Sequence, residues 1–386
     1  MAEMGMLEVD IVSKEHIKPS FPTPSHLRNY KLSLLDQLIP APYAPIVLFY
    51  PNNDGTNLTN IPKRLELLKK SLSETLTLFY PLAGKIKDNL CIECNDDGAY
   101  FAEANVNGSL SEFLSHPDLL LIHKFLPCEL VLKESVAGTY VSNIQVNVFT
   151  CGGIDIVCTP NFDAASLFPA SNNLWLRDSS MVMWGSLFRK GKSLTRRLVF
   201  HASAIATLKA QATSSCVRHP TRLEKNGVMV AGVFYWESPL DTAARCIDKD
   251  EVGLQGLVGE IRGAISRIDD DFVQKLLQGE EKRNSVMRES LKEIGEEGTK
   301  EGGDYFGFSS RCNLGFYEAD FGWGKPIWIS SIGSSDPVFL NLTILVDTRL
   351  GDGIEAWVTL DEQDKAILVC NPKLLIFASL DPSPLT

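Results

Sequence analysis

Apolar positions near the start of the chain change from a continuous run to helical spacing. The run Ala44–Tyr50 ends at Pro51, which predicts a buried strand. Leucine and phenylalanine then recur three or four residues apart over 65–79, which predicts an amphipathic helix. Asn60 is the expected N-cap of this helix, and Pro62 suits its first turn.

Further along, polar and apolar residues alternate with a period of two, as in strands that have one buried face. The segment 144–158 follows this pattern on both sides of Gly152-Gly153, which predicts a hairpin. Shorter strands are predicted around Cys91–Cys94 and Ala99–Phe101. The residues between them, Asn95–Gly98, are typical of a turn.

The second half also mixes the two patterns. Helical spacing predicts helices at 198–212, at 254–272 and in the charge-dense segment 278–303, whose charges indicate a solvated face. A buried strand is predicted over Val228–Trp236, and a hairpin over 342–359. No sequence period suggests a solenoid or a propeller. Strands and helices in both halves therefore indicate an α/β or α+β protein.

Length and composition limit the alternatives. A chain of 386 residues indicates two domains, which we expect at 1–190 and 191–386. Apolar residues make up 44% and charged residues 22%, which excludes wholesale disorder. A net charge of −11 without a compact basic cluster argues against nucleic acid as a partner. No apolar run approaches the roughly 20 residues that cross a bilayer, so we expect no contact with a membrane.

The N-terminal residues and the cysteines indicate the compartment. Glu3, Glu8 and Asp10 occur early, and no apolar stretch follows a basic start, so no secretory signal is expected. The nine cysteines contain one C-x-x-C pair, Cys91 and Cys94, which favours reduced thiols in a cytoplasmic protein. No second pair at zinc-site spacing accompanies it, so no metal is expected.

Several motifs, in order along the chain, resemble those of the plant BAHD acyltransferase family. They are Pro22-Thr23-Pro24 with Tyr30–Gln37, Phe79–Lys85, Cys94–Gly98, Asp320–Pro326 and Asp352–Val358. The Asp-Phe-Gly-Trp-Gly element at 320–324 is the most specific of them. Their order and their spread over most of the chain argue against coincidence.

The resemblance implies an α/β fold of two chloramphenicol-acetyltransferase-like domains, with mixed sheets, flanking helices and a solvent channel between the domains. It implies an acyl-CoA co-substrate, a small-molecule alcohol or amine acceptor, no bound cofactor and a monomer, and it assigns no residue here to acyl-CoA. In the family, the histidine of a His-x-x-x-Asp motif removes the acceptor's proton during attack on the thioester carbonyl. Imidazole suits this step because its unperturbed pKa, about 6.5, lies near neutrality.

This motif is absent from the sequence. None of the six histidines has an aspartate four residues later: His16, His26, His116, His123, His201 and His219. The family histidine follows a strand that corresponds to Ile154–Cys158. Thr159 and Asp163 have the motif's spacing, as if the histidine were replaced, and a threonine hydroxyl is no base near neutral pH. We favour a second alignment, in which Pro160–Pro169 matches a downstream family segment and the motif is deleted near 158–160. No catalytic residue is then expected.

The histidines that are present have ordinary interpretations. His116 and His219 precede prolines and are expected in solvated loops. His201 is expected to open the helix at 198–212. His123 lies among apolar residues, so we expect a core or edge histidine.

A second gap is predicted near 223–227. Pro220–Glu224 resembles a family segment that leads into a helix and an Asn-Leu-Arg strand, but no Asn-Leu-Arg occurs here. In the family that arginine pairs with the aspartate of the Asp-Phe-Gly-Trp-Gly loop, so Asp320 is expected to lack its partner. We expect the loop to be structural, since its glycines permit unusual backbone angles and its tryptophan packs. Its residues are Asp320, Phe321, Gly322, Trp323 and Gly324.

The resemblance implies acyl-CoA-dependent transfer of acetyl or another acyl group to an alcohol of a plant specialised metabolite. A general base contributes about 10²–10⁴ in rate, so we expect this chain to be catalytically impaired. One alternative is a non-catalytic protein that binds CoA or a metabolite. Another is a shortened gene product of low stability.

Overall fold

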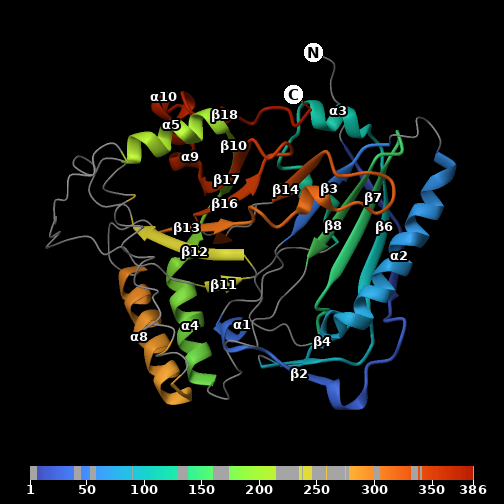
Figure 1. Ribbon diagram of the computed structural model, residues 1–386, viewed down its shortest axis with the longest axis horizontal. Helices are drawn as coiled ribbons and strands as arrows, with labels where there is room; N and C mark the ends of the chain where they lie inside the picture. Colours follow the sequence, from blue (N-terminus) through green and yellow to red (C-terminus); the bar gives the residue numbers. More distant parts are fainter. Residues whose placement is uncertain are drawn as a thin grey trace, which may run out of the picture.

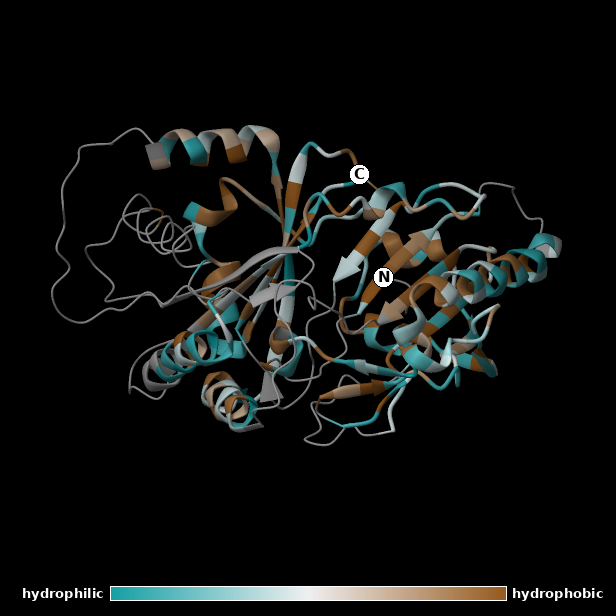
Figure 2. Ribbon diagram, turned by 60° about the horizontal axis from the view of Figure 1, so that its bottom comes forward, coloured by the Kyte–Doolittle hydropathy of each residue, from teal (hydrophilic) through white to brown (hydrophobic). Residues whose placement is uncertain are grey.

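Two large β-sheets with accompanying helices make up the protein (Figure 1). The computed structural model describes residues 7–38, 45–52, 58–88, 90–127, 138–159, 174–213, 234–236, 238–245, 278–298, 305–331, 338–339 and 341–385, with Val258 and Gln274 as single positions. Strands and helices alternate in both halves, which confirms the predicted α/β class with two sheet-containing domains. Apolar residues concentrate in the strands that lie between the helices (Figure 2).

The first sheet has six strands in the order β1-β6-β7-β8-β3-β14. Their bounds are β1 Val9–Ile17, β6 Ala99–Val106, β7 Asn143–Phe149, β8 Ile154–Thr159, β3 Ile46–Tyr50 and β14 Trp328–Ser331. β6 and β7 run parallel, and the other neighbours are antiparallel. The hairpin predicted over 144–158 is confirmed as β7 and β8.

The hydrophobic pattern does not reveal β1. Most of its residues are polar, and its apolar Ile11 and Val12 are 42% and 61% exposed. The strand exists because its backbone pairs with β6, from Val9 opposite Val106 to Ile17 opposite Ala99. As an edge strand it needs little burial of its own.

Helix α2, Ile61–Leu78, confirms the helix predicted around 65–79 and lies along the first sheet (Figure 1). Leu68 and Leu76 of α2 are buried in the main core. Asn60 occupies the N-cap position, but its side chain makes no capping hydrogen bond. Asn60 also ends the 3-10 helix η2, Leu58–Asn60, and has helical backbone angles instead of the extended ones that capping requires.

Short elements complete the first half. The opposite face of the sheet is covered in part by α3, Leu110–Ser115, and the 3-10 helix η4, Ile122–Phe125. The strands predicted around Cys91–Cys94 and Ala99–Phe101 exist, but in different sheets: β5 lies in a three-stranded sheet of order β2-β5-β4, and β6 lies in the first sheet. The remaining bounds are η1 Ser25–Leu27, β2 Asn29–Lys31, α1 Leu34–Leu38, η3 Tyr80–Ala83, β4 Lys85–Ile86 and β5 Cys91–Glu93.

The second sheet has seven strands in the order β11-β12-β13-β16-β17-β10-β18, with only β13 and β16 parallel among the pairs of described strands. Their bounds are β11 Phe234–Trp236, β12 Ser238–Arg245, β13 Tyr305–Ser310, β16 Leu342–Asp347, β17 Gly353–Asp361, β10 Ser193–His201 and β18 Ser379–Leu380. The hairpin predicted over 342–359 is confirmed as β16 and β17.

Helices and small elements surround this sheet (Figure 1). They are α4 Leu174–Leu187, α5 Ala202–Thr213, α8 Glu280–Gly298, α9 Glu362–Val369, α10 Pro372–Leu375, the 3-10 helix η5 Phe316–Glu318, and the paired short strands β9 Arg189–Lys190 and β15 Val338–Phe339. None of the helices in the described part of the chain combines the length and the apolar character of a membrane span.

Some predictions for the second half need correction. The helix predicted at 198–212 is wrong at its start, because Leu198–His201 belong to β10, which pairs with both β17 and β18, and α5 begins at Ala202. The charge-dense helix is confirmed as α8, although Met287 and Leu291 are buried. The strand predicted over Val228–Trp236 is described only at β11. The helix predicted at 254–272 lies outside the described residues except for Val258, which is helical.

The two halves share one sheet. β14 comes from the second half of the sequence but pairs with β3 of the first sheet, with Trp328 opposite Phe49 and Ser331 opposite Ile46. Trp328 stacks on Phe49 and also contacts Trp357 of β17, with ring centroids 5.2 and 5.7 Å apart. The division at residues 190 and 191 therefore separates all strands of the two large sheets except β14.

Gly98 provides a test of the turn predicted at Asn95–Gly98. Its φ is +95°, and a Cβ added there would lie 2.5 Å from the carbonyl oxygen of Ile17. We expect Gly98→Ala to lower the free energy of unfolding by on the order of 3 kcal/mol, from left-handed strain and a clash with backbone. Urea titration followed by circular dichroism measures this loss.

Gly351→Ala is the matched control. Gly351 has a φ of +66°, and a Cβ there meets no heavy atom within 4 Å. The control keeps the strain and removes the clash, so it should cost about 1–2 kcal/mol. Equal losses in the two variants would contradict the close approach of Gly98 to β1.

Candidate functional site

The end of β8 is the position to which the family resemblance assigns the catalytic base. β8 lies between β7 and β3, with Thr159 opposite Asn143 and Cys158 opposite Ile46. Thr159 is the last residue of the strand, and both alignments of the missing motif concern the residues that follow. Asp163 and the segment 160–169 lie outside the described residues.

No histidine that the structure describes is buried at this position. All five are exposed: His16, His26, His116, His123 and His201. His16 stacks on Tyr140 of the first half, with ring centroids 4.6 Å apart. The core or edge placement expected for His123 is wrong, because His123 points out of η4 while Ile122 and Phe125 face inward. His201 ends β10 instead of opening a helix, and His219 lies outside the described residues.

A row of buried polar side chains follows one face of the first sheet. Asn143, Gln145 and Asn147 alternate along β7, and Asp155 of β8 lies opposite Asn147. Gln145 Nε2 donates to Asn147 Oδ1 over 2.8 Å, and Asn147 Nδ2 donates to Asp155 Oδ1 over 2.6 Å. Asn147 Nδ2 also donates to the carbonyl oxygen of Phe125, which ties η4 to the sheet.

Asp155 is fully buried at the inner end of this row. Burial raises the pKa of its carboxyl group well above the usual value, against the opposing effect of the hydrogen bond from Asn147. Its Oδ2 has no hydrogen-bond partner among the described residues. Asp155 precedes Thr159 by four positions, roughly 13 Å along a strand, so its carboxylate cannot replace a base at the end of β8.

The junction between the two sheets holds a second buried polar group. Arg197 of β10 donates from Nη1 to Glu355 Oε1 of β17 over 3.0 Å, and the two side chains are only 2% and 7% exposed. The guanidinium lies over the Trp328 ring, 5.2 Å from its centroid. Burial raises the pKa of Glu355, while Arg197 and the indoles of Trp328 and Trp357 act in the opposite direction.

The Asp-Phe-Gly-Trp-Gly loop is a turn around Asp320. Asp320 Oδ1 accepts from the backbone N–H of Gly322 and Gly324, over 2.8 and 2.9 Å, and these bonds lower the pKa of the carboxyl group. Both glycines have positive φ, +97° and +107°. Phe321 and Trp323 stack on each other at 5.7 Å. The exposed Asp320 is thus held by its own loop.

This loop and Asp155 lie on opposite faces of the first sheet. Tyr50 donates its hydroxyl to the carbonyl oxygen of Ala319 beside the loop, and Arg64 of α2 lies over Trp323. Phe49, whose side chain points the other way, is opposite Asp155 in the strand register. The loop therefore lies on the α2 side and does not contact the buried polar row.

The statement that the sequence has no compact basic cluster is wrong, because five of the nine residues Arg189–Arg197 are basic. Within this run, four side chains form ion pairs with acidic residues far along the chain: Arg189 with Asp361, Lys192 with Glu362, Arg196 with Asp381 and Arg197 with Glu355. Because these cations are matched inside the molecule, the run is poorly suited to a phosphate-binding surface. The partners are more than 150 residues away, so sequence spacing does not reveal them.

Metal chemistry finds no support in the described part of the chain. No group of three or more His, Cys, Asp and Glu side chains is gathered there in a way that could hold an ion. Of the C-x-x-C pair, Cys94 is buried, and burial raises the pKa of its thiol to about 11.

Comparison with known proteins assigns the fold and its relatives. A model described as the Transferase family matches residues 7–200 and 242–373. An epi-neemfruitin B 7-O-acetyltransferase, L7AT, from Melia azedarach is 37% identical over 465 positions, covering 98% of this chain and 100% of the relative. A limonoid 7-O-acetyltransferase from Citrus sinensis is 38% identical over 463 positions, with coverage of 98% and 100%. The crystal structure of vinorine synthase matches with a TM-score of 0.69 and 25% identity, covering 96% of this chain and 99% of that one.

The same alignments show that these relatives are longer than this chain. The two alignments extend over 465 and 463 positions, whereas this chain has 386 residues. Many aligned positions therefore hold a residue of the relative and a gap in this chain. The family match omits residues 201–241. The gap predicted near 223–227 lies outside the described residues and stays a prediction.

Asp155 yields a prediction about stability. Its pKa is raised in the folded protein, so stability falls as pH increases from about 3.8, the ordinary value for an aspartate, through the folded-state pKa. Asp155→Asn keeps the acceptor for Asn147 and removes this penalty. We expect the variant to melt at a higher temperature than the parent, by a margin of a few degrees that is larger at pH 8 than at pH 5.

Asp10→Asn, an exposed change on β1, is the control and should show no such dependence on pH. Thermal melting followed by circular dichroism at both pH values measures the two differences. An Asp155→Asn variant that loses stability as pH rises, relative to the parent, would show that the carboxylate is ionised and paired.

Proposed function

Because this chain belongs to the Transferase family, the family of the plant BAHD acyltransferases, we propose that it derives from an acyl-CoA-dependent O-acetyltransferase and is itself catalytically impaired. One observation carries the proposal: the sequence has no His-x-x-x-Asp motif, and each described histidine is exposed. His16 is in line with Thr159 across the first sheet, but three strands away from it. Fold alone does not secure activity, which depends on the groups at the site.

The missing step is proton removal. In acyl transfer, the acceptor oxygen bonds to the thioester carbonyl carbon, the carbon–sulfur bond breaks, and the hydroxyl proton passes to a base and then to the departing thiolate. Thr159 ends β8 with a hydroxyl that does not ionise near neutral pH. Asp155 is buried too far back along the strand. No general base is therefore found at this position among the described residues.

Deletion explains the loss better than substitution. The long gaps in the alignments support it, because a single exchanged histidine would leave the chain as long as its relatives. The pairing of β8 is compatible with either origin, since the strand keeps both neighbours as far as Cys158. The chain therefore keeps the sheet that presents the motif in the family and lacks the motif.

The acceptor class follows from the relatives. Both acetyltransferases described above are named for the 7-O position, one of epi-neemfruitin B and one of limonoids. We assign the ancestral activity to transfer of acetyl from acetyl-CoA to a hydroxyl of a limonoid-type plant metabolite, without a bound cofactor. A monomeric, cytoplasmic protein is part of the same proposal: the monomer rests on the family resemblance, and the compartment rests on the expected reduced thiols.

An acetyl-transfer assay tests the proposal. With acetyl-CoA and a limonoid that carries a free 7-hydroxyl, we expect an initial rate at least about 10²-fold below that of the Citrus sinensis relative under the same conditions. A comparable rate that persists when each histidine of this chain is replaced in turn would overturn the proposal. Calorimetric titration with acetyl-CoA separates the two alternatives: binding without turnover indicates a binding protein, and no binding with a low melting temperature indicates a shortened product.

A gain-of-function variant sharpens the test. Inserting a segment with the family's His-x-x-x-Asp motif after Thr159 should raise the rate, provided that the segment folds against β8. The matched control is the same insertion with its histidine replaced by alanine, which should remain at the parent's rate. Equal rates for the two insertions would mean that the missing histidine is not the cause of low activity.

A further inference from the structure

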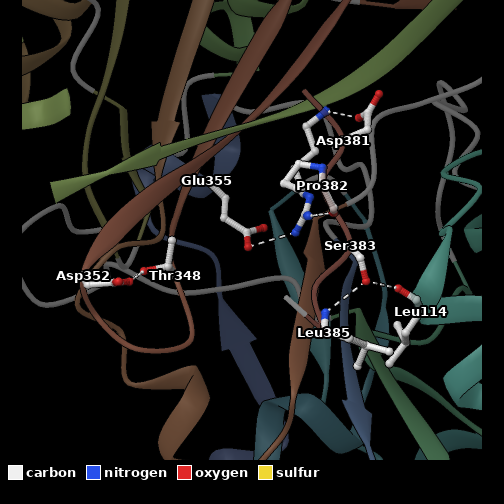
Figure 3. Close-up of polar contacts among 9 residues, drawn as sticks. Leu114, Thr348, Asp352, Glu355, Asp381, Pro382, Ser383 and Leu385 are labelled. Carbon is white, nitrogen blue, oxygen red and sulfur yellow. Dashed lines mark hydrogen bonds and ion pairs between the residues drawn. The ribbon is translucent and has the colours of Figure 1, made fainter. Parts of the chain in front are cut away.

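The C-terminal residues leave the second sheet and cross to the first half of the molecule (Figure 3). At the start of this crossing, Asp381 is held at three points by β10. Its backbone N–H donates to the carbonyl oxygen of Arg197 over 2.8 Å, and its Oδ1 accepts from the Arg197 N–H over 2.9 Å. Its Oδ2 pairs with Arg196 Nη1 over 2.9 Å.

At its other end, the crossing segment is attached to α3. Ser383 Oγ donates to the carbonyl oxygen of Leu114 over 2.9 Å and accepts from the N–H of Leu385 over 3.2 Å (Figure 3). Leu114 is fully buried and belongs to the first half of the chain. Five residues, Asp381–Leu385, therefore connect β10 of the second sheet to a helix that covers the first sheet.

Arg197 lies between these two attachments and contacts all three parts. Its Nη2 donates to the carbonyl oxygen of Pro382 in the crossing segment, and its Nη1 donates to Glu355 of the second sheet. Its guanidinium lies over Trp328, which belongs to the first sheet. A buried guanidinium that loses a hydrogen-bond acceptor is costly, so removal of Pro382 would weaken the whole cluster.

We infer that Asp381–Leu385 form a C-terminal strap that fixes the second sheet against α3, with Arg197 as the residue through which the strap also holds Glu355 and Trp328. The strap closes the junction where the two halves meet without contributing a strand to either sheet. Its release loosens α3 and the edge strand β14 at the junction, while the other strands of the two sheets stay paired. The inference concerns conformation and does not depend on the proposed acyl transfer.

The backbone of Asp381 fits this role. Its φ is +45°, a left-handed conformation that aspartate and asparagine tolerate better than most residues. This turn redirects the chain from β18 toward α3. Asp381→Asn keeps the tolerance and an oxygen for the Arg197 N–H, so it removes only the charge that pairs with Arg196.

Hydrogen exchange measured by mass spectrometry tests the strap in the full-length protein without any substrate. In Ser383→Ala, one hydrogen bond between the halves is lost, and we expect exchange in peptides covering 110–115 and 328–331 to rise about fivefold, as for a net loss of about 1 kcal/mol. Asp381→Asn should raise exchange around Arg197. In a chain truncated after Leu380, we expect hydrogen exchange to rise more than in either substitution, by tenfold or more at 110–115, at 328–331 and around Arg197.

Two controls separate the strap from general destabilisation. Ser383→Thr keeps the hydroxyl and should exchange like the parent. Glu362→Gln removes the partner of Lys192, an exposed pair outside the strap, and should leave the three regions unchanged. Unchanged exchange at 110–115 and 328–331 in both Ser383→Ala and the truncated chain would overturn the inference. If the truncated chain does not fold, the hydrogen exchange of Ser383→Ala and Asp381→Asn tests the inference on its own.

Discussion

The pairing of β14 with β3 is the contact on which the arrangement of the two halves depends. A strand from late in the sequence completes a sheet built early in it, and this places Trp328 between Phe49 and Trp357. The aromatic contacts in turn provide the surface under the Arg197 guanidinium. A cation can be buried here because Glu355, a peptide carbonyl and an indole ring together replace the water that it loses.

Two aspartates, one in the first sheet and one in the loop before β14, show how surroundings determine the protonation state of a carboxyl group. Asp320 is exposed, and backbone N–H groups of its own turn favour its ionised form. Asp155 is buried among apolar residues with one amide donor, so its neutral form is favoured. Neither is placed to take a proton from a substrate at the end of β8. Asp320 thus holds a turn and Asp155 takes part in an internal hydrogen bond.

The local hydrophobic pattern of the sequence correctly predicts the elements in which buried and exposed residues alternate regularly. The leucines of α2 and the alternation in β7–β8 and β16–β17 led to correct assignments. The pattern does not reveal β1 because Ile11 and Val12 are exposed. The end of β10 is mistaken for a helix because Leu198–Phe200 continue into the apolar residues of α5. The place of β14, the partners of the basic run and the environment of Asp155 depend on residues distant in sequence, which no local pattern contains.

The ladder of β8 has one more consequence. This strand is bonded on both sides until its final residues, so the architecture of the sheet does not need whatever follows it. The fold and the catalytic residue can therefore be inherited separately: a protein lineage can lose the residue that reacts and still keep the sheet. The loss of the general base proposed above leaves the paired strands of β8 in place, so a chain of this fold remains available for a use other than acyl transfer.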